Sequence, residues 1–327
     1  MFTVCLAEQG WFDINDASTT GMSIMIAQGN WFDESDADFL DGIYIHQNHP
    51  SWYNRLEILE KDTPLFYIVG NLANEEREFM VQFLLNYEAI SFRLLGEEHY
   101  QYSLTFSLAS GYELNLPFIL NADYLNMNEI YALTLITFME PHLPFPNEKL
   151  MHNAVSFELI VGNGSAINLA SSYNVAPIYR KNFPPPMSGF QDLRVNQQLE
   201  ENLHDLDYAA PPPSVIHALP GEDIPLAFFA YPSIQTFDYG DNLDDYLIFG
   251  FLDWKPVKLN GSPYLRVDAT NHDYDVIVDK GIFTIKAPNE PGVYTFIAFI
   301  SSNPSHRRTN INFLLDSSWA FTIEVIE

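Results

Sequence analysis

Short apolar runs alternate with clusters of turn-forming residues along most of the chain. Runs rich in Phe, Tyr, Ile, Val and Thr are bounded by Gly, Pro, Asn and Asp at intervals of about 8–15 residues, which is typical of strands. Residues 101–108 alternate apolar and polar side chains, which predicts a strand with one face on a core and one in solvent. The dipeptide Asn260–Gly261 predicts a tight hairpin turn. The apolar face of residues 101–108 carries Tyr102, Leu104, Phe106 and Leu108.

One segment, residues 193–206, has helical spacing. Its apolar residues recur at i, i+4, i+8 and i+11, which predicts a short helix. Proline triplets at Pro184–Pro186 and Pro211–Pro213 flank this segment and favour extended backbone. We therefore interpret residues 163–222 as a linker with Pro-rich stretches and one short helix, or equally as an ordered arm of the unit that follows. The residues of the helical stripe are Val195, Leu199, Leu203 and Leu206.

Two hairpins of nearly equal length recur in the sequence. Segments Tyr131–Pro141 and Tyr294–Pro304 both open with Tyr, run through apolar residues and close on Pro after the same number of positions. A closing strand follows each, at Val155–Val161 and Ala320–Ile326. This order predicts internal duplication, although strand-rich segments also resemble one another through composition alone. Two further matches lie upstream: Phe79–Tyr87 resembles Ile224–Tyr231, and Gly21–Gly29 resembles Gly164–Ser172.

These correspondences divide the chain into four parts. Residues 1–20 are an N-terminal strand extension, and residues 21–162 a first β-rich unit with its sandwich core at about 73–162. Residues 163–222 are the linker or arm, and residues 223–327 form a second β-sandwich.

Many short strands without alternating helices favour sandwiches or barrels. The last part of each unit resembles a seven-stranded immunoglobulin-like sandwich, in which Tyr131 and Tyr294 would stand where such folds often carry a tyrosine corner. The predicted fold class is all-β, with two related immunoglobulin-like β-sandwich units in tandem and little helix. Many unrelated families share this architecture, so it implies no particular function.

Composition excludes several classes of partner. The chain has 327 residues, 47% of them hydrophobic, and its 15 Lys and Arg stand against 43 Asp and Glu, for a net charge of −28. Nucleic acid would be repelled, and an anionic membrane surface is disfavoured. No apolar run approaches the ~18 residues of a transmembrane segment. The N-terminus has neither the basic nor the long apolar region of a signal peptide, so we expect none. The sequence does not distinguish a cytoplasmic location from one at a surface or in an assembled particle.

A single cysteine, Cys5, excludes an intrachain disulfide and a Cys-based zinc site. Cys5 lies in Phe2–Ala7, whose pattern predicts an apolar strand. In such a strand a lone cysteine is ordinarily a small, buried apolar residue. Phosphate-binding glycine loops, G-x-S-x-G and H-E-x-x-H are absent from the sequence. No catalytic residue is therefore predicted, and a non-enzyme is favoured, although an active site of dispersed residues stays open.

Candidate metal-binding residues are scattered along the sequence. His46 and His49 form the only close histidine pair, and His142 and His306 occupy corresponding hairpin tips. Calcium binds several oxygens gathered in one loop, so acidic clusters are candidates for it. None has the EF-hand pattern, and a solvated acidic surface is their ordinary interpretation, so no metal ligand is assigned. The clusters span residues 33–41, 238–245 and 268–279.

Tryptophans next to predicted turns are the remaining candidates for a ligand-binding site. Trp11 and Trp31 each precede acidic turn residues, and an aromatic platform beside carboxylates is typical of sugar-binding sites. Core packing is the ordinary role of such residues. The candidate ligand-binding residues are Trp11, Trp31, Asp33, Asp36 and Asp38.

Three functions compete on these grounds. The leading hypothesis is a non-enzymatic interaction or structural protein that presents tandem β-sandwich surfaces to a protein partner or to an assembly, including self-assembly. The second is a carbohydrate-binding, lectin-like protein that uses the Trp-bearing turns, with calcium as its cofactor if an acidic cluster binds one. The third is a hydrolase with two catalytic carboxylates.

Overall fold

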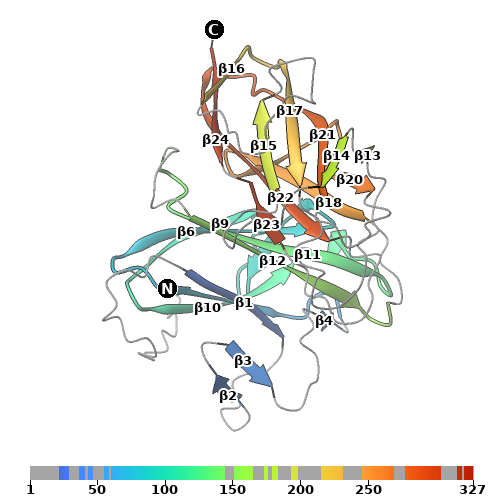
Figure 1. Ribbon diagram of the computed structural model, residues 1–327. Coiled ribbons are helices and arrows are strands. Elements are labelled where there is room, and N and C mark those ends of the chain that lie inside the picture. Colours follow the sequence, from blue (N-terminus) through green and yellow to red (C-terminus); the bar gives the residue numbers. More distant parts are fainter. Residues whose placement is uncertain are drawn as a thin grey trace. The chain divides into compact units, whose positions relative to one another are not determined.

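Alternating and continuous apolar runs both become strands in the computed structural model (Figure 1). The chain is nearly all β: among the described residues only Ala122–Tyr124 (η1) form a helical turn. Two compact units divide the chain, and two short strands, β2 (Ala37–Leu40) and β3 (Ile43–His46), form a separate hairpin. The residues that the structure describes are 22–28, 37–40, 43–46, 55–58, 60–143, 151–164, 173–175, 179–182, 193–197, 215–230, 245–268, 277–302, 315–318 and 320–326.

The first unit is a sandwich of two sheets, seen as two layers in Figure 1. One sheet has the order β1-β5-β10-β8, and the other the order β4-β12-β11-β6-β7, with β9 also paired to β6. The first sheet consists of β1 (Met22–Gln28), β5 (Leu65–Asn71), β10 (Glu113–Leu120) and β8 (Phe92–Leu94). The second consists of β4 (Arg55–Ile58), β12 (Met151–Val161), β11 (Ile130–Met139), β6 (Arg77–Leu85), β7 (Glu88–Ile90) and β9 (Ser103–Leu108).

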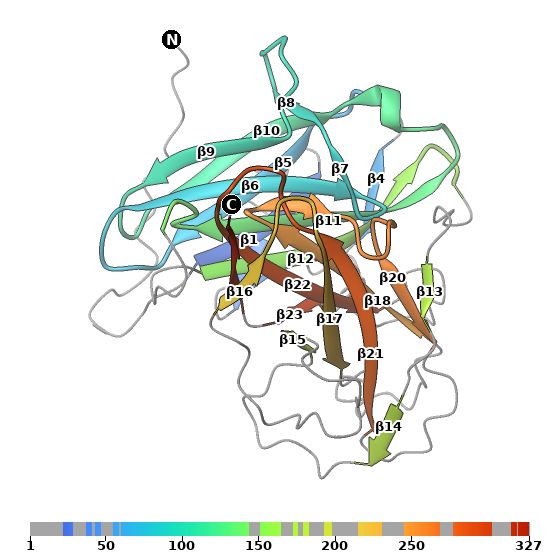
Figure 2. The same ribbon diagram turned by 90° about the horizontal axis from the view of Figure 1, so that it is seen from above.

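The second unit is also a two-sheet sandwich, and Figure 2 shows its strands from above. Its sheets have the orders β13-β20-β18-β22-β24-β16 and β14-β21-β17-β15, with β19 paired to β18 and β23 to β22. The first sheet consists of β13 (Tyr173–Val175), β20 (Leu265–Asp268), β18 (Asp245–Leu252), β22 (Gly292–Ser302), β24 (Phe321–Val325), β16 (Val215–Ala218), β19 (Lys255–Val257) and β23 (Leu315–Ser317). The second consists of β14 (Tyr179–Asn182), β21 (Ile277–Lys286), β17 (Asp223–Ala230) and β15 (Leu193–Gln197).

Strand pairing follows the same plan in both units. The β6, β11 and β12 strands of the first unit pair as β18, β22 and β24 do in the second, and β5 with β10 as β17 with β21. In both units the last strand has a parallel neighbour, β4 or β16, and a strand from further upstream joins the other sheet, β1 or β15. The units therefore share most of their strand pairings, although β8 and β14, which pair with β10 and β21, come from different places in the chain. Their common descent stays a prediction.

This plan revises one of the sequence correspondences. The hairpins beginning at Tyr131 and Tyr294 do correspond, as β11 and β22. Segment Phe79–Tyr87 forms β6, which matches β18 rather than the β17 strand within Ile224–Tyr231. In strand pairing β1, within Gly21–Gly29, matches β15, whereas most of its expected counterpart Gly164–Ser172 lies outside the described residues. Apolar composition is shared by neighbouring strands, so it could not distinguish between them.

The helix expected over residues 193–206 is wrong for the part that the structure describes. Leu193–Gln197 form β15, paired antiparallel with β17. Leu193 and Val195 are both buried, as one face of a strand requires. The rest of that segment lies outside the described residues. Strands β13 to β16, all from the predicted linker or arm, pair with strands of the second unit.

Two other local predictions are confirmed. Residues 103–108 form a strand whose Leu104 and Phe106 pack on the core; the expected place of Tyr102 on that face is wrong, because Tyr102 lies just before the strand and is 55% exposed. Asn260 and Gly261 form a turn with φ of 50° and 80°, closed by Leu259 and Ser262. The predicted all-β sandwich class is confirmed as well.

Each unit also has a two-residue turn that the sequence did not reveal. Asn86 and Tyr87 have φ of 51° and 68°, and Asp253 and Trp254 have φ of 51° and 64°. The two turns occupy matching places, because Asn86 N–H donates to Ala132 O on β11 (2.8 Å) and Asp253 N–H donates to Thr295 O on β22 (2.7 Å). Turns of this twist suit a two-residue β-hairpin and fix its register.

A tyrosine near the start of β11 and of β22 ties each unit to its own backbone. The Tyr131 hydroxyl accepts the Asn126 N–H (2.6 Å) and donates to Glu129 Oε2 (2.9 Å). The Tyr294 hydroxyl donates to the Glu290 carbonyl (2.9 Å). Burial raises the pKa of Tyr131 to about 12, so this hydroxyl stays protonated at neutral pH. Both residues thus have the tyrosine-corner geometry expected from the sequence.

We predict that Tyr131→Phe destabilises the first unit more than Tyr294→Phe destabilises the second. Tyr131 is 5% exposed and makes two hydrogen bonds, whereas Tyr294 is half-buried and bonds one carbonyl. We expect losses of about 2 and about 1 kcal/mol in the free energy of unfolding. Urea unfolding followed by tyrosine and tryptophan fluorescence measures both. Equal losses, or a larger loss for Tyr294→Phe, would contradict the prediction.

Candidate functional site

Most of the ligand-binding residues predicted from the sequence lie outside the described part of the chain. Trp11, Trp31, Asp33 and Asp36 are among these, and Asp38 falls within β2. Their role stays a prediction. Trp254 can be placed: it is 8% exposed in the turn after β18, which fits core packing.

The strand register brings two of the acidic clusters together. Asp245, from one cluster, is the partner of Asp268, from another, across β18 and β20. Asp279 is fully buried, and its Oδ2 accepts the Tyr246 hydroxyl (3.2 Å). Within the described ranges no group of three or more His, Cys, Asp or Glu is arranged to hold a metal ion. Calcium binding therefore stays a prediction.

Among the predicted histidines, His142 has the best-defined surroundings. Its Nδ1 lies 3.0 Å from Glu78 Oε1, and its Nε2 lies 3.6 Å from Glu140 Oε2. Glu140 also pairs with the buried Arg77 (3.5 Å), which in turn pairs with Glu75 (2.6 Å). This network joins the start of β6 to the end of β11, and the His142 side chain at its end is 56% exposed. His49 and His306 lie outside the described residues.

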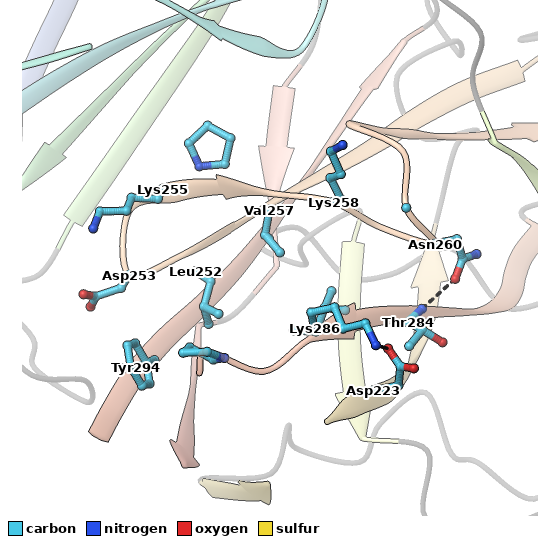
Figure 3. Close-up of a pocket in the computed structure, with 14 residues that line it drawn as sticks. Asp223, Leu252, Asp253, Lys255, Val257, Lys258, Asn260, Thr284, Lys286 and Tyr294 are labelled. Atoms are coloured by element: carbon cyan, nitrogen blue, oxygen red, sulfur yellow. Dashed lines mark hydrogen bonds and ion pairs between the residues drawn. The ribbon is translucent and has the colours of Figure 1, made fainter. Parts of the chain in front are cut away.

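A groove in the second unit is lined entirely by described residues. It has a volume of about 770 Å³ and lies between β19 with the following turn on one side and the end of β21 on the other. Leu252 and Val257 lie in its centre, between the Lys255–Lys258 segment and the Lys286–Asp223 pair (Figure 3). Both apolar side chains are half-buried and also pack against the core. The groove thus has an apolar floor continuous with the sandwich interior.

Hydrogen bonds of Asn260 join the turn on one side of the groove to β21 on the other side. Asn260 Oδ1 accepts the Thr284 N–H (2.8 Å), and its own N–H donates to the Thr284 carbonyl (2.9 Å), as Figure 3 shows for the side chain. The turn therefore covers the β21 backbone and holds the two walls at a fixed separation.

Charged side chains surround the apolar floor. Lys255, Lys258 and Lys286 line the groove together with Asp223 and Asp253, so the lining carries a small positive charge on a chain with a net charge of −28. Lys286 Nζ lies 2.7 Å from Asp223 Oδ1, with both side chains well exposed, so that pair contributes little to stability. An apolar centre with a polar rim is the usual layout of a recognition surface.

Exposed tyrosines gather on the first unit. The hydroxyls of Tyr102 and Tyr124 lie 3.0 Å apart, and these side chains are 55% and 43% exposed. Arg93 lies over the ring of Tyr100 (5.8 Å), and its Nε donates to the Tyr100 hydroxyl (3.4 Å). The hydrogen bond to Tyr102 is the main cause that raises the pKa of Tyr124. We call Tyr100, Tyr102, Tyr124 and Arg93 the tyrosine cluster.

Sequence reasoning missed both surfaces. The groove residues come from four separate segments that meet only through the pairing of two sheets. The tyrosine cluster had a weak signal, since Tyr100 and Tyr102 are close in sequence, but Tyr124 comes from η1, after β10. In addition, no helix among the described residues has the length and apolar character needed to cross a membrane.

No family model matches this sequence, and no curated protein matches it. Solved structures similar to the chain include adhesin and pilus-subunit domains, with low TM-scores, so the fold assignment rests on the strand pairing. One is the C-terminal domain of the Streptococcus pyogenes antigen I/II-family protein AspA, with 9% identity over 84% of this chain and 95% of that chain (TM-score 0.23). Another is a CsuC–CsuE chaperone–tip adhesion subunit complex from Acinetobacter baumannii Csu pili, with 11% identity over 84% and 96% (TM-score 0.23). A red sea bream transglutaminase has 10% identity over 83% of this chain, which spans 30% of that enzyme (TM-score 0.20).

We predict that Asn260→Ala destabilises the second unit more than Asn260→Gly. Glycine keeps the positive φ of 50° but loses the side-chain oxygen that binds Thr284, at a cost of about 1 kcal/mol. Alanine also suffers in that conformation, which adds about 1 kcal/mol. Urea unfolding measures the free energies, with Asn289→Ala, at an exposed asparagine of the same unit, as control. Equal effects of the two Asn260 variants would show that the turn conformation is not required.

Proposed function

We propose that this chain is a non-enzymatic interaction protein whose second unit binds an extended segment of a protein partner in the groove. The single observation behind the proposal is the apolar floor of Leu252 and Val257 surrounded by lysines. Extended peptides bind such surfaces by placing alternate side chains in the hollow, and their charged residues then meet the rim.

The charge of the rim indicates the chemistry of the bound segment. Lys255 and Lys258 are exposed at the groove and would favour carboxylates flanking an apolar side chain. The chain as a whole is strongly acidic, but charges are screened beyond about 8 Å at physiological ionic strength. A bound peptide therefore experiences mainly the charges of the lining itself, where three lysines outnumber the two aspartates and Lys286 is paired with Asp223.

We predict that a peptide library selected on the protein yields acidic–apolar sequences. Lys255→Glu combined with Lys258→Glu should weaken binding of a selected peptide at least tenfold, because two attractive charges become repulsive. Val257→Asp should abolish it by placing a charge on the floor. Fluorescence anisotropy at 0.15 M salt measures the dissociation constants.

Lys61→Glu provides the matched control for this experiment. Lys61 belongs to the first unit and is not among the residues that line the groove, so Lys61→Glu makes the same change in charge as Lys255→Glu or Lys258→Glu alone and should leave the affinity within twofold. Selected peptides that bind the double lysine variant as tightly as the wild type would refute the groove as the binding site. Failure to select any peptide would refute the proposal itself.

A second candidate function, glycan binding, is favoured by the tyrosine cluster. Exposed tyrosine rings can stack on sugars, and their hydroxyls can bond sugar hydroxyls. Tyr102 and Tyr124 already hold each other in position through their hydroxyls, which lowers the entropic cost of binding.

We predict that any glycan recognised by this surface loses affinity at least tenfold with Tyr102→Ala and Tyr124→Ala. Phenylalanine at either position should retain part of the affinity, because it keeps the stacking face and loses only the hydroxyl. Tyr112→Ala is the control, since Tyr112 is similarly exposed (41%) and lies outside the cluster. A glycan array followed by calorimetry measures the effect, and binding that tolerates Tyr102→Ala and Tyr124→Ala alike would exclude this surface.

A further inference from the structure

The outer edge of β9 presents a row of backbone groups that β6 does not use. In β6, alternate residues face opposite neighbours, and the Asn86 N–H to Ala132 O bond shows that the even-numbered residues face β11. The odd-numbered residues face β9, where Val81 is the partner of Leu104 and Phe79 of Phe106. The backbone N–H and C=O groups of Ser103, Thr105 and Ser107 therefore point away from β6.

Nothing in the sequence of β9 discourages a further strand from pairing there. Residues 101–110 contain no charged residue and no proline, the usual protections of an exposed edge. The β19 edge strand of the second unit has both, in Lys255 and Pro256. Among the described strands, β9 pairs with β6 alone.

The matching edge of the second unit already has an additional strand. There β20, which takes the place of β9, pairs with β18 on one side and with β13 in parallel on the other. Tyr173 is the partner of Leu265 and Val175 of Val267. An edge in this position of the sandwich thus accepts a parallel strand from upstream in the chain.

We propose that the β9 edge is a strand-docking site and that its occupant is the segment Phe2–Leu6 of the same chain. The β13 strand begins at Tyr173, 20 residues before Leu193, the first residue of β15. Phe2 stands 20 residues before Met22, the first residue of β1, which matches β15. The segment lies outside the described residues, so the proposal rests on the β9 edge, the β13 precedent and the sequence.

The register follows by transfer from the second unit. The pairings place Leu265 in the position of Leu104 and Val267 in that of Phe106, so Phe2 would lie beside Leu104 and Val4 beside Phe106. The apolar pattern agrees with this register: Phe2, Val4 and Leu6 would join the core-facing residues of β9, whereas Thr3 and Cys5 would lie beside Thr105 and Ser107.

The lone cysteine makes this register directly testable. Neighbouring strands lie about 4.8 Å apart, so Cys5 and a cysteine introduced by Ser107→Cys should form a disulfide under mild oxidation. Ser103→Cys is the matched control, because it lies about 13 Å further along the same edge and should not react. Non-reducing electrophoresis and mass spectrometry of the linked peptides measure the yield, and a monomeric product is expected.

Each alternative gives a different result. A disulfide-linked dimer in place of a monomer would mean that a second copy supplies the strand and would overturn docking within one chain. Equal yields for Ser103→Cys and Ser107→Cys, or no disulfide for either, would overturn the docking site altogether.

A second pair of variants tests the face of the docked strand. Val4→Asp would place a carboxylate against the core and should lower the rate of disulfide formation with Ser107→Cys at least tenfold. Thr3→Asp makes the same change on the solvent side and should alter the rate less than threefold. Equal rates for the two would contradict the proposed facing of the segment. None of these variants alters a residue that lines the groove, so a failure of this proposal is distinguishable from a failure of peptide binding.

Discussion

The register imposed by two tight turns is the constraint on which the rest of the structure depends. Asn86–Tyr87 and Asp253–Trp254 hold two successive residues each at positive φ, a conformation that costs side chains other than glycine about 1 kcal/mol or more apiece. Tyr87 and Trp254 are buried, so packing offsets that cost. Each turn fixes which residues of the preceding strand face the central strand of its sheet and which face the edge.

The register determines which side chains and which backbone groups are exposed at the edge of each sheet. In the second unit it places Lys255 and Val257 on the face of Leu252, which creates the groove, and leaves Pro256 at a position where no backbone N–H is needed. In the first unit it directs the backbone of Thr105 outward along an uncharged edge. The two sandwiches thus share much of their strand pairing yet differ in surface: the β19 edge of the second unit carries proline and lysine, whereas the β9 edge of the first unit carries neither a proline nor a charged residue.

Much of the fold was predictable because its signals are local. Asn260–Gly261 was recognisable as a turn since these residues tolerate positive φ, whereas Tyr87 and Trp254 give no such signal, and their turns were missed. The segment at Leu193 was misread because a four-residue apolar spacing fits a strand face as well as a helix face. The groove was unpredictable for another reason: its residues meet only through the pairing of β17 with β21 and of β18 with β19.

Residue-resolved amide exchange along β9 tests the register most directly. It should be measured by nuclear magnetic resonance on the full chain and on a chain lacking residues 2–8. The account predicts slow exchange at Leu104, Phe106 and Leu108 in both, with Thr105 and Ser107 slow in the full chain and fast in the shortened one. Slow exchange at Thr105 and fast exchange at Phe106 in the shortened chain would contradict it, because the turn would then have set the opposite register.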